Sequence, residues 1–210
     1  MFKQTLFAQD IKIIDKEVLH EGFCRVERYT LTQKRFDGGW SQPFTREFIA
    51  KPVAVGALPY DPRTNQVVLI EQFRIGALKN SITPWLIEIV AGIKDQEHEE
   101  SDEEIVRREM REEVGLEAEA LISIHNYFTT PGCSTEKVKL FCAKVDATQA
   151  PQFCGLKEEH EDIKVHIVST AEAFAAVRSG QINNGFTIVA LQWLELNLRE
   201  VNKLWQKVGG

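Results

Sequence analysis

The acidic segment Arg108–Leu116 constrains this chain more than any other part of the sequence. Its pattern is typical of a helix, and Glu109, Glu112 and Glu113 stand at i, i+3 and i+4, so all three lie on one flank. Like charges four residues apart destabilise a helix by roughly a few tenths of a kcal/mol. A hard divalent cation would turn that repulsion into attraction, because Mg²⁺ binds carboxylates together with substrate phosphates. The segment therefore favours a helix that holds a phosphate-carrying metal ion.

An ordinary acidic surface helix is the alternative interpretation. Glutamate is a good helix former, and Arg108 can pair with Glu112 at helical spacing. The apolar side chains of the same segment favour the metal, because Glu109 and Glu113 border the stripe that should face the core. That stripe consists of Val106, Met110 and Val114. Carboxylates at the edge of a core need a partner, which a cation supplies.

The flanks of this helix predict its boundaries. Ser101 followed by Glu104 is a capping-box pattern, and Gly115 is placed where a glycine commonly ends a helix. Upstream, the segment Pro84–Gly92 is predicted to form a buried strand that breaks at the glycine. The sequence therefore predicts a strand, a loop and an acidic helix, in that order.

This stretch resembles the Nudix box, the signature of hydrolases that act on nucleoside diphosphates linked to another moiety. The matching positions read Gly92-x7-Glu100-x7-Arg108-Glu109-Met110-Arg111-Glu112-Glu113-Val114-Gly115-Leu116. The family usually has five residues between the glycine and the first glutamate, whereas this chain has the seven residues 93–99. Two extra residues in a loop are tolerated and leave the register of the helix intact.

Composition agrees with a soluble enzyme. The 210 residues are 43% hydrophobic and 27% charged, which allows one or two domains with a substantial core. The net charge of −6 argues against a general nucleic-acid binder, which needs a basic face. No apolar run is long enough for a transmembrane helix, and Met1–Asp10 lacks a signal-peptide core. The four cysteines form no CxxC pair, as expected of thiols in a reducing compartment. We therefore expect a cytoplasmic protein that binds neither nucleic acid nor membrane.

Alternating and apolar segments predict the other strands. Residues 22–31 and 44–49, joined by a turn at Asp37-Gly38-Gly39, predict a small antiparallel sheet, and Lys51-Pro52 marks the end of that domain. The later strands are expected at residues 53–58, 66–72, 120–128, 137–145 and 163–168.

Two helices are expected to close the chain. Ser169 with Glu172 forms a second capping box, and Gly180 ends the first of these helices. The second is expected over residues 186–205, with core candidates at Ile188, Leu191, Leu194, Leu198 and Leu204. Strands placed between helices predict an α+β fold class, an α/β/α sandwich with a small N-terminal antiparallel sheet. The predicted domains are residues 1–51 and 52–210.

Three further clusters bear on the substrate. Each is by itself an ordinary surface feature: a turn at residues 128–136, a solvated acidic loop at residues 156–162, and exposed charges around Arg46 and Arg74. Guanidinium is nevertheless the natural partner of a diphosphate. Together with the box and the segments Pro84–Leu86 and Ala190–Leu194, these clusters resemble bacterial ADP-ribose pyrophosphatases along almost the whole chain.

The resemblance implies a set of site residues and a homodimer that exchanges its N-terminal sheet domains. It implies that Glu159 is the base that activates water. The implied metal ligands are the carbonyl of Ala91 and the carboxylates of Glu109, Glu113 and Glu161. The implied substrate-binding residues are Phe23, Cys24, Arg46, Glu47, Lys51, Arg74, Ile93, Thr130, Pro131, Gly132 and Glu136. Cys24 departs from the second aromatic residue expected there, and Glu112 is interpreted as a partner of Arg108 or as a residue behind the ligands.

The expected activity is hydrolysis of the diphosphate of ADP-ribose to AMP and ribose 5-phosphate, with Mg²⁺, or alternatively Mn²⁺, as cofactor. Two other functions stay open. One is hydrolysis of another nucleoside diphosphate sugar such as GDP-mannose, because the box is shared and base selectivity lies in loops. The other is a non-catalytic ligand sensor, although such proteins typically lose box glutamates that this chain retains.

Overall fold

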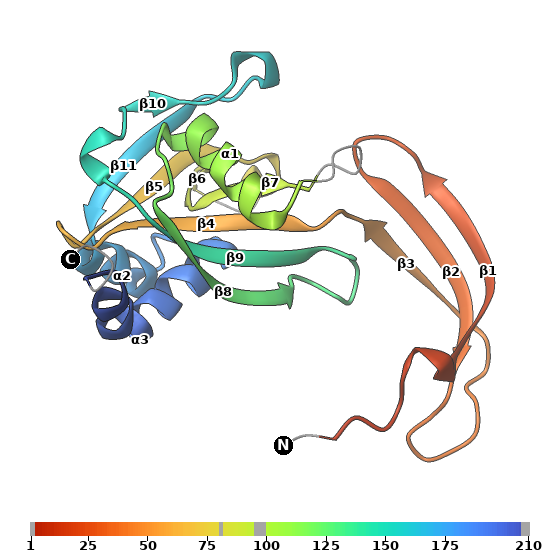
Figure 1. Cartoon of the computed structure of the whole chain (residues 1–210). Coiled ribbons are helices and arrows are strands. Elements are labelled where there is room, and N and C mark those ends of the chain that lie inside the picture. The colour runs from red at the N-terminus through yellow and green to blue at the C-terminus, as the bar shows by residue number, and fades with distance from the viewer. Residues whose placement is uncertain (1–2, 80–81, 95–99, 207–210) are drawn as a thin grey trace. The chain divides into compact units, whose positions relative to one another are not determined.

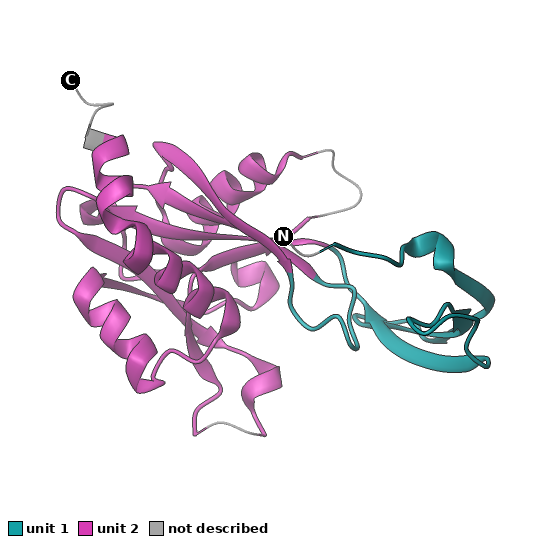
Figure 2. Ribbon diagram, turned by 90° about the horizontal axis from the view of Figure 1, so that it is seen from below, with its two compact units in different colours: residues 1–52, 128–136 teal, residues 53–127, 137–210 magenta. Residues whose placement is uncertain are grey.

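The computed structural model describes residues 3–79, 82–94 and 100–206, and Figure 1 traces their helices and strands. The chain divides into two compact units (Figure 2). The first comprises residues 1–52 and 128–136, and the second comprises residues 53–127 and 137–210. The loop at 128–136 therefore groups with the N-terminal strands although it lies far from them in sequence.

The first unit is built on a three-stranded antiparallel sheet in the order β1-β2-β3. Its strands are β1 (Ile11–His20), β2 (Arg25–Gln33) and β3 (Phe44–Ala50). The sequence predicts the second and third strands, but β1 was not expected. Its pairing with β2 shifts register between Ile13 and Asp15 and again between Val18 and His20, so the apolar side chains of β1 lose the period of two.

The second unit contains, among its described residues, an eight-stranded sheet in the order β10-β11-β5-β4-β9-β8, with β6 paired to β5 and β7 to β4. Strands β4 and β9 run parallel, and β5 runs antiparallel to β4, β6 and β11. The bounds are β4 (Ala54–Asp61), β5 (Gln66–Phe73), β6 (Trp85–Glu88), β7 (Val90–Ile93), β8 (Ala120–Phe128), β9 (Lys137–Lys144), β10 (Phe153–Cys154) and β11 (Ile163–Ser169).

The segment predicted as one strand, Pro84–Gly92, forms two strands in the structure. Strand β6 pairs with β5, whereas β7 pairs with β4. Ile89 lies between them, and its N–H donates to Thr187 Oγ1 at 3.0 Å instead of joining a strand ladder. A continuous apolar run does not reveal where a buried chain changes neighbours, so the sequence pattern could not predict this break.

Helices cover both faces of this sheet (Figure 1). Helix α1 (Asp102–Val114) packs on one face, and α2 (Thr170–Ser179) and α3 (Gly185–Gln206) pack on the other. The strands serve both cores by alternation, since Val55 and Ala57 face α1 while Leu58 and Tyr60 face the opposite core. This arrangement confirms the predicted α/β/α sandwich.

The predicted helix ends are confirmed. The Ser101 side chain accepts from the backbone N–H of Glu104, and Gly115 adopts the left-handed conformation with φ 64°. Ser169 caps α2 in the same way, with Glu172 completing the box. The prediction of Leu204 as a core residue is wrong, because Val201 and Trp205 occupy the inward face of α3 there. Within the described residues, no helix is both long and apolar enough to cross a membrane.

Candidate active site

Glu109, a predicted metal ligand on helix α1, packs closely against the backbone of strand β7. A Cβ atom built on Gly92 would lie 2.0 Å from Oε1 of Glu109, so only glycine leaves room for this carboxylate. Glu109 also pairs with Arg108, whose Nη1 lies 2.8 Å from Oε1. Burial raises the pKa of Glu109, and the positive charge of Arg108 opposes that shift. The box glycine therefore has a packing role, which is to accept the Glu109 side chain.

Glu113 is the most deeply buried carboxylate of the acidic helix, with 3% of its surface exposed. Its Oε2 accepts a hydrogen bond from the backbone N–H of Ala91 at 3.0 Å. Burial raises the pKa of Glu113 well above its ordinary value, and the charges of Glu109 and Glu161 act in the same direction. Glu113 thus lies inside the core edge rather than beside it, and an ionised Glu113 requires positive charge nearby.

Arg108 neutralises part of this acidic helix. Its guanidinium lies 2.9 Å from Glu112 Oε2 and 3.5 Å from Glu100 Oε2, in addition to its contact with Glu109. The interpretation of Glu112 as a partner of Arg108 is therefore confirmed. The two-residue insertion before Glu100 falls on residues 95–99 and lies outside the described residues.

The acidic loop after β10 contains a short 3-10 turn, η4 (Lys157–Glu159), which the sequence did not predict. The loop closes on itself, because the N–H groups of Glu159 and Glu161 both donate to the carbonyl of Leu156. Oε2 of Glu161 accepts from the N–H of Leu156 at 3.3 Å, which fixes that side chain. Glu159 is exposed on the turn, whereas Glu161 is half-buried and its charge acts on Glu109 and Glu113.

These carboxylates fit a hard divalent cation by their chemistry. The negative charges of Glu109 and Glu161 act on the buried Glu113, so the three carboxylates repel one another. All three offer oxygen atoms, which Mg²⁺ and Mn²⁺ prefer. Among the described residues, however, no three acidic, histidine or cysteine side chains converge closely enough to bind one ion. Each carboxylate is turned toward a partner of its own: Arg108, the N–H of Ala91, or the N–H of Leu156.

Substitution Gly92→Ala tests the packing of Glu109 on β7. The added methyl group would lie 2.0 Å from Oε1 and 2.4 Å from Cγ of Glu109, so we expect it to displace this side chain from Cγ outward. Loss of this orientation should lower metal affinity or activity by about 10- to 100-fold. Metal titration followed by activity and thermal unfolding would measure both effects. An unchanged activity would contradict the assignment of Glu109.

A second polar cluster surrounds Arg74 at the end of β5. Arg74 Nε donates to Oε2 of Glu88 at 2.7 Å, and Glu88 lies in β6 with only 4% of its surface exposed. Burial raises the pKa of Glu88, which Arg74 opposes. The positive charge of Arg74 also opposes the rise in the pKa of Glu113. Ile93, the other predicted substrate residue of this unit, is half-exposed at the end of β7.

In the first unit, the structure brings together several of the predicted substrate residues. The ammonium group of Lys51 lies 5.1 Å from the ring of Phe23, a side chain that is 92% exposed. The backbone N–H of Lys51 donates to Oγ1 of Thr135 at 2.8 Å, which ties the end of β3 to the loop at 128–136. That loop contains Thr130, Pro131, Gly132 and Glu136, and Glu136 accepts from Oγ1 of Thr129.

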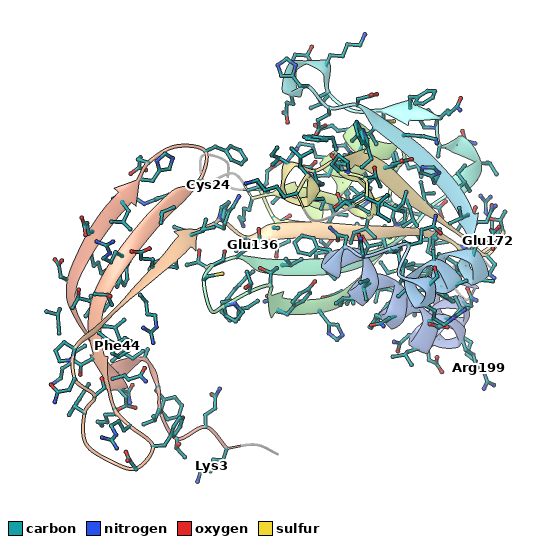
Figure 3. All side chains as sticks on the ribbon, turned by 180° about the vertical axis from the view of Figure 1, so that it is seen from behind. Lys3, Cys24, Phe44, Glu136, Glu172 and Arg199 are labelled. Carbon is teal, nitrogen blue, oxygen red and sulfur yellow. The ribbon has the colours of Figure 1, made fainter. Side chains whose placement is uncertain are left out.

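Arg46 and Glu47 lie elsewhere on the same sheet. Cys24 precedes β2 and Phe44 begins β3, at opposite ends of the paired strands (Figure 3). The guanidinium of Arg46 lies over the ring of Phe44 at 4.6 Å, and Glu47 forms an ion pair with Arg28 at 2.6 Å. Arg46 is thus several residues along β3 from the cluster of Phe23 and Lys51, and the structure does not gather all the predicted substrate residues of this unit in one place.

Sequence reasoning missed the polar side chains around Arg74. The signal was present, because Glu88 interrupts an otherwise apolar predicted strand, and a buried charge requires a partner. Its partners Gln72 and Asn184 lie on other elements, so no local pattern joins the three residues.

Comparison with known proteins defines the class. A model of the NUDIX domain matches residues 50–186, which span both β7 and the acidic helix. This chain belongs to the Nudix family.

Particular relatives are similar over nearly the full length. The ADP-ribose pyrophosphatase of Haemophilus influenzae is 38% identical over 207 residues, which cover 97% of this chain and 94% of that protein. The ADP-ribose pyrophosphatase of Escherichia coli K12 is 39% identical over 96% of this chain and 95% of its own. The GDP-mannose pyrophosphatase of Cronobacter sakazakii is 31% identical over 89% of this chain and 96% of its own. A crystal structure of an ADP compounds hydrolase superposes with a TM-score of 0.72 at 20% identity, covering 94% of this chain and 98% of that one, which supports the fold.

Proposed function

We propose that this protein hydrolyses the diphosphate of ADP-ribose to AMP and ribose 5-phosphate with Mg²⁺, or Mn²⁺, as cofactor. The observation that carries the proposal is the buried carboxylate of Glu113. The negative charge of Glu109 and the positive charge of Arg74 both act on this carboxylate. Nudix hydrolases generally need divalent metal ions, and this set of oxygen ligands fits one. The two ADP-ribose pyrophosphatases, which are more similar to this chain than the GDP-mannose pyrophosphatase is, support the choice of substrate.

The chain's own residues supply binding, charge and a proton acceptor. Glu109, Glu113, Glu161 and the carbonyl of Ala91 are assigned as ligands of the ion, which neutralises phosphate charge when bound. Arg74 is assigned to the diphosphate, where a guanidinium adds positive charge as the leaving phosphate departs. Glu159 is assigned as the base that takes a proton from the attacking water. Its side chain lies on an exposed turn whose hydrogen bonds to Leu156 come from the backbone, so this side chain can approach a substrate without breaking them.

The residues assigned to the rest of the nucleotide stay predictions. Phe23 has the exposed ring that base stacking requires, and Lys51 beside it adds positive charge. The homodimer, the exchange of residues 1–51 across it and the cytoplasmic location are also predictions. Strand β1 supports a dimer, because its exposed side chains include several apolar residues that the described part of one chain leaves uncovered: Ile11, Ile13, Ile14, Val18 and Leu19.

Parallel kinetics with ADP-ribose and GDP-mannose test this function. We expect kcat/KM for ADP-ribose to exceed that for GDP-mannose by about 10²-fold, because discrimination by pocket contacts is of that order. Activity should disappear with EDTA and return with Mg²⁺. A preference for GDP-mannose would reject ADP-ribose as the substrate but would still support a nucleoside diphosphate sugar hydrolase. Absence of any diphosphate hydrolysis with Mg²⁺ would leave the ligand sensor as the function.

A further inference from the structure

Glu88 is a buried carboxylate for which the proposed reaction, as assigned above, has no use. Its Oε2 accepts from Arg74 Nε at 2.7 Å and from Gln72 Nε2 at 3.5 Å. Its Oε1 accepts from Asn184 Nδ2 at 2.6 Å. Both oxygens are therefore engaged: Gln72 lies in β5, Arg74 directly follows that strand, and Asn184 directly precedes α3. Burying a charge costs desolvation free energy, and an apolar side chain of similar size could fill this space without that cost.

The hydrogen bond to Glu88 engages the Nε edge of the Arg74 guanidinium and leaves its two terminal Nη groups available to another acceptor. Nε of Arg74 donates to the carboxylate, and among the described residues its terminal Nη atoms make no hydrogen bond. The side chain of Arg74 is partly exposed, so these groups are accessible. A guanidinium offers five N–H donors in a planar fork that matches phosphate oxygens in pairs. Arg74 is thus held at Nε with its fork directed away from Glu88.

We propose that Glu88 is a positioning residue that holds the fork of Arg74 toward an anionic phosphate group of the substrate. The inference rests on the proposed function for the assignment of a diphosphate to this site. Arg74 follows β5 directly, and its positive charge acts on Glu113 of the acidic helix, so the guanidinium that Glu88 holds belongs to the same site. Free rotation of an arginine side chain would otherwise have to be lost on binding, and Glu88 removes that freedom beforehand.

The position requires a carboxylate rather than an amide. Arg74 and Asn184 both present N–H donors to Glu88, so two acceptor oxygens are needed at once. In Glu88→Gln, the new NH₂ group would face one of these donors. Asn184 cannot turn its oxygen toward residue 88 without loss elsewhere, because Oδ1 accepts from backbone N–H groups at the start of α3. The substitution therefore releases Arg74 or uncaps α3.

A double-mutant cycle between Glu88→Gln and Arg74→Ala tests the proposal. We expect Glu88→Gln alone to lower kcat/KM by about 10- to 100-fold, the range for one charged hydrogen bond. In the Arg74→Ala background the same substitution should have no further effect, because the fork it positions is absent. Losses that simply add in the double variant would overturn the proposal, since they would mean that Glu88 acts independently of Arg74.

Binding without catalysis supplies the second readout. The methylene analogue of ADP-ribose, in which CH₂ replaces the bridging oxygen, is titrated calorimetrically in EDTA against each variant. Its affinity should fall in Glu88→Gln and in Arg74→Ala, and fall no further in the double variant. Thr187→Val is the matched control, because it removes the hydrogen bonds that Thr187 Oγ1 accepts from the N–H of Ile89 and donates to Asn184 Oδ1, but none to Glu88 or Arg74. This control should lower Tm and leave affinity and KM unchanged; if Glu88→Gln behaves like it, Glu88 is only structural.

A second variant and a second substrate extend the double-mutant cycle. If Glu88→Gln does not fold, Glu88→Asp replaces it in the cycle, because aspartate keeps both acceptor oxygens but draws them back by one methylene group. If the wild-type protein prefers another nucleoside diphosphate sugar, the cycle is run on that substrate. Non-additive losses on that substrate would support the positioning role of Glu88 even though ADP-ribose is not the preferred substrate. Additive losses on that substrate would reject the positioning role without bearing on the hydrolase activity.

Discussion

Glu113→Gln is expected to lower kcat by roughly 10²- to 10³-fold while the protein stays folded, because a metal ion supplies several kcal/mol of charge stabilisation to the reaction. Glutamine preserves the shape of the side chain and its hydrogen bond from the N–H of Ala91. It removes the negative charge that an ion would bind. Steady-state kinetics at saturating Mg²⁺ would measure the loss, and Glu103→Gln, an exposed position on the same helix, is the control. A rate close to that of the wild type would reject Glu113 as a ligand.

The same substitution is expected to change the pH dependence of the metal-free protein. Folding raises the pKa of Glu113 above its ordinary value of 4.5, so the folded state favours the protonated form. Its contribution to stability is therefore fully present below pH 4.5 and is lost as pH rises through the folded pKa. Glutamine does not titrate, so Glu113→Gln should lose less stability between acidic and neutral pH. Urea unfolding in EDTA would compare the two proteins, and equal losses would contradict the prediction.

The acidic helix was predictable because its signals are local. Its capping box, its apolar stripe and its terminal glycine all fall within fifteen consecutive residues, 101–115, and all agree with the structure. Local agreement of this kind specifies an element before any tertiary contact forms. The α/β/α layering followed from the order of strands and helices for the same reason.

Non-local features escaped prediction. Strand β1 carries two register shifts that disguise its alternation, and the break between β6 and β7 depends on which neighbour each strand pairs with. The depth of Glu113 is also tertiary, because periodicity placed it at the border of the stripe while the packed core encloses it. The contact of Glu88 with Asn184 joins residues almost a hundred positions apart, which no spacing rule reveals.

Glu159→Gln is expected to lower kcat by about 10²- to 10⁴-fold with metal affinity largely retained, because a general base contributes in that range. Glu159 lies on the exposed turn η4, and the backbone of the loop is closed by hydrogen bonds to Leu156, so the substitution leaves the loop intact. Glu161 keeps its own hydrogen bond from the N–H of Leu156 and its charge near Glu113. Loss of kcat without loss of metal binding therefore separates a base from a ligand.

Kinetics at saturating metal identify which carboxylate of this loop accepts the proton. With Glu159 as base, Glu159→Gln lowers kcat while the Mg²⁺ concentration for half-maximal rate stays that of the wild type. Glu158→Gln is the matched control on the same turn, and it should retain the wild-type kcat. Glu161→Gln should instead weaken metal binding, since its charge acts on Glu109 and Glu113. If Glu159→Gln keeps the wild-type kcat and Glu158→Gln loses it, the base is Glu158 and the assignment of Glu159 is wrong.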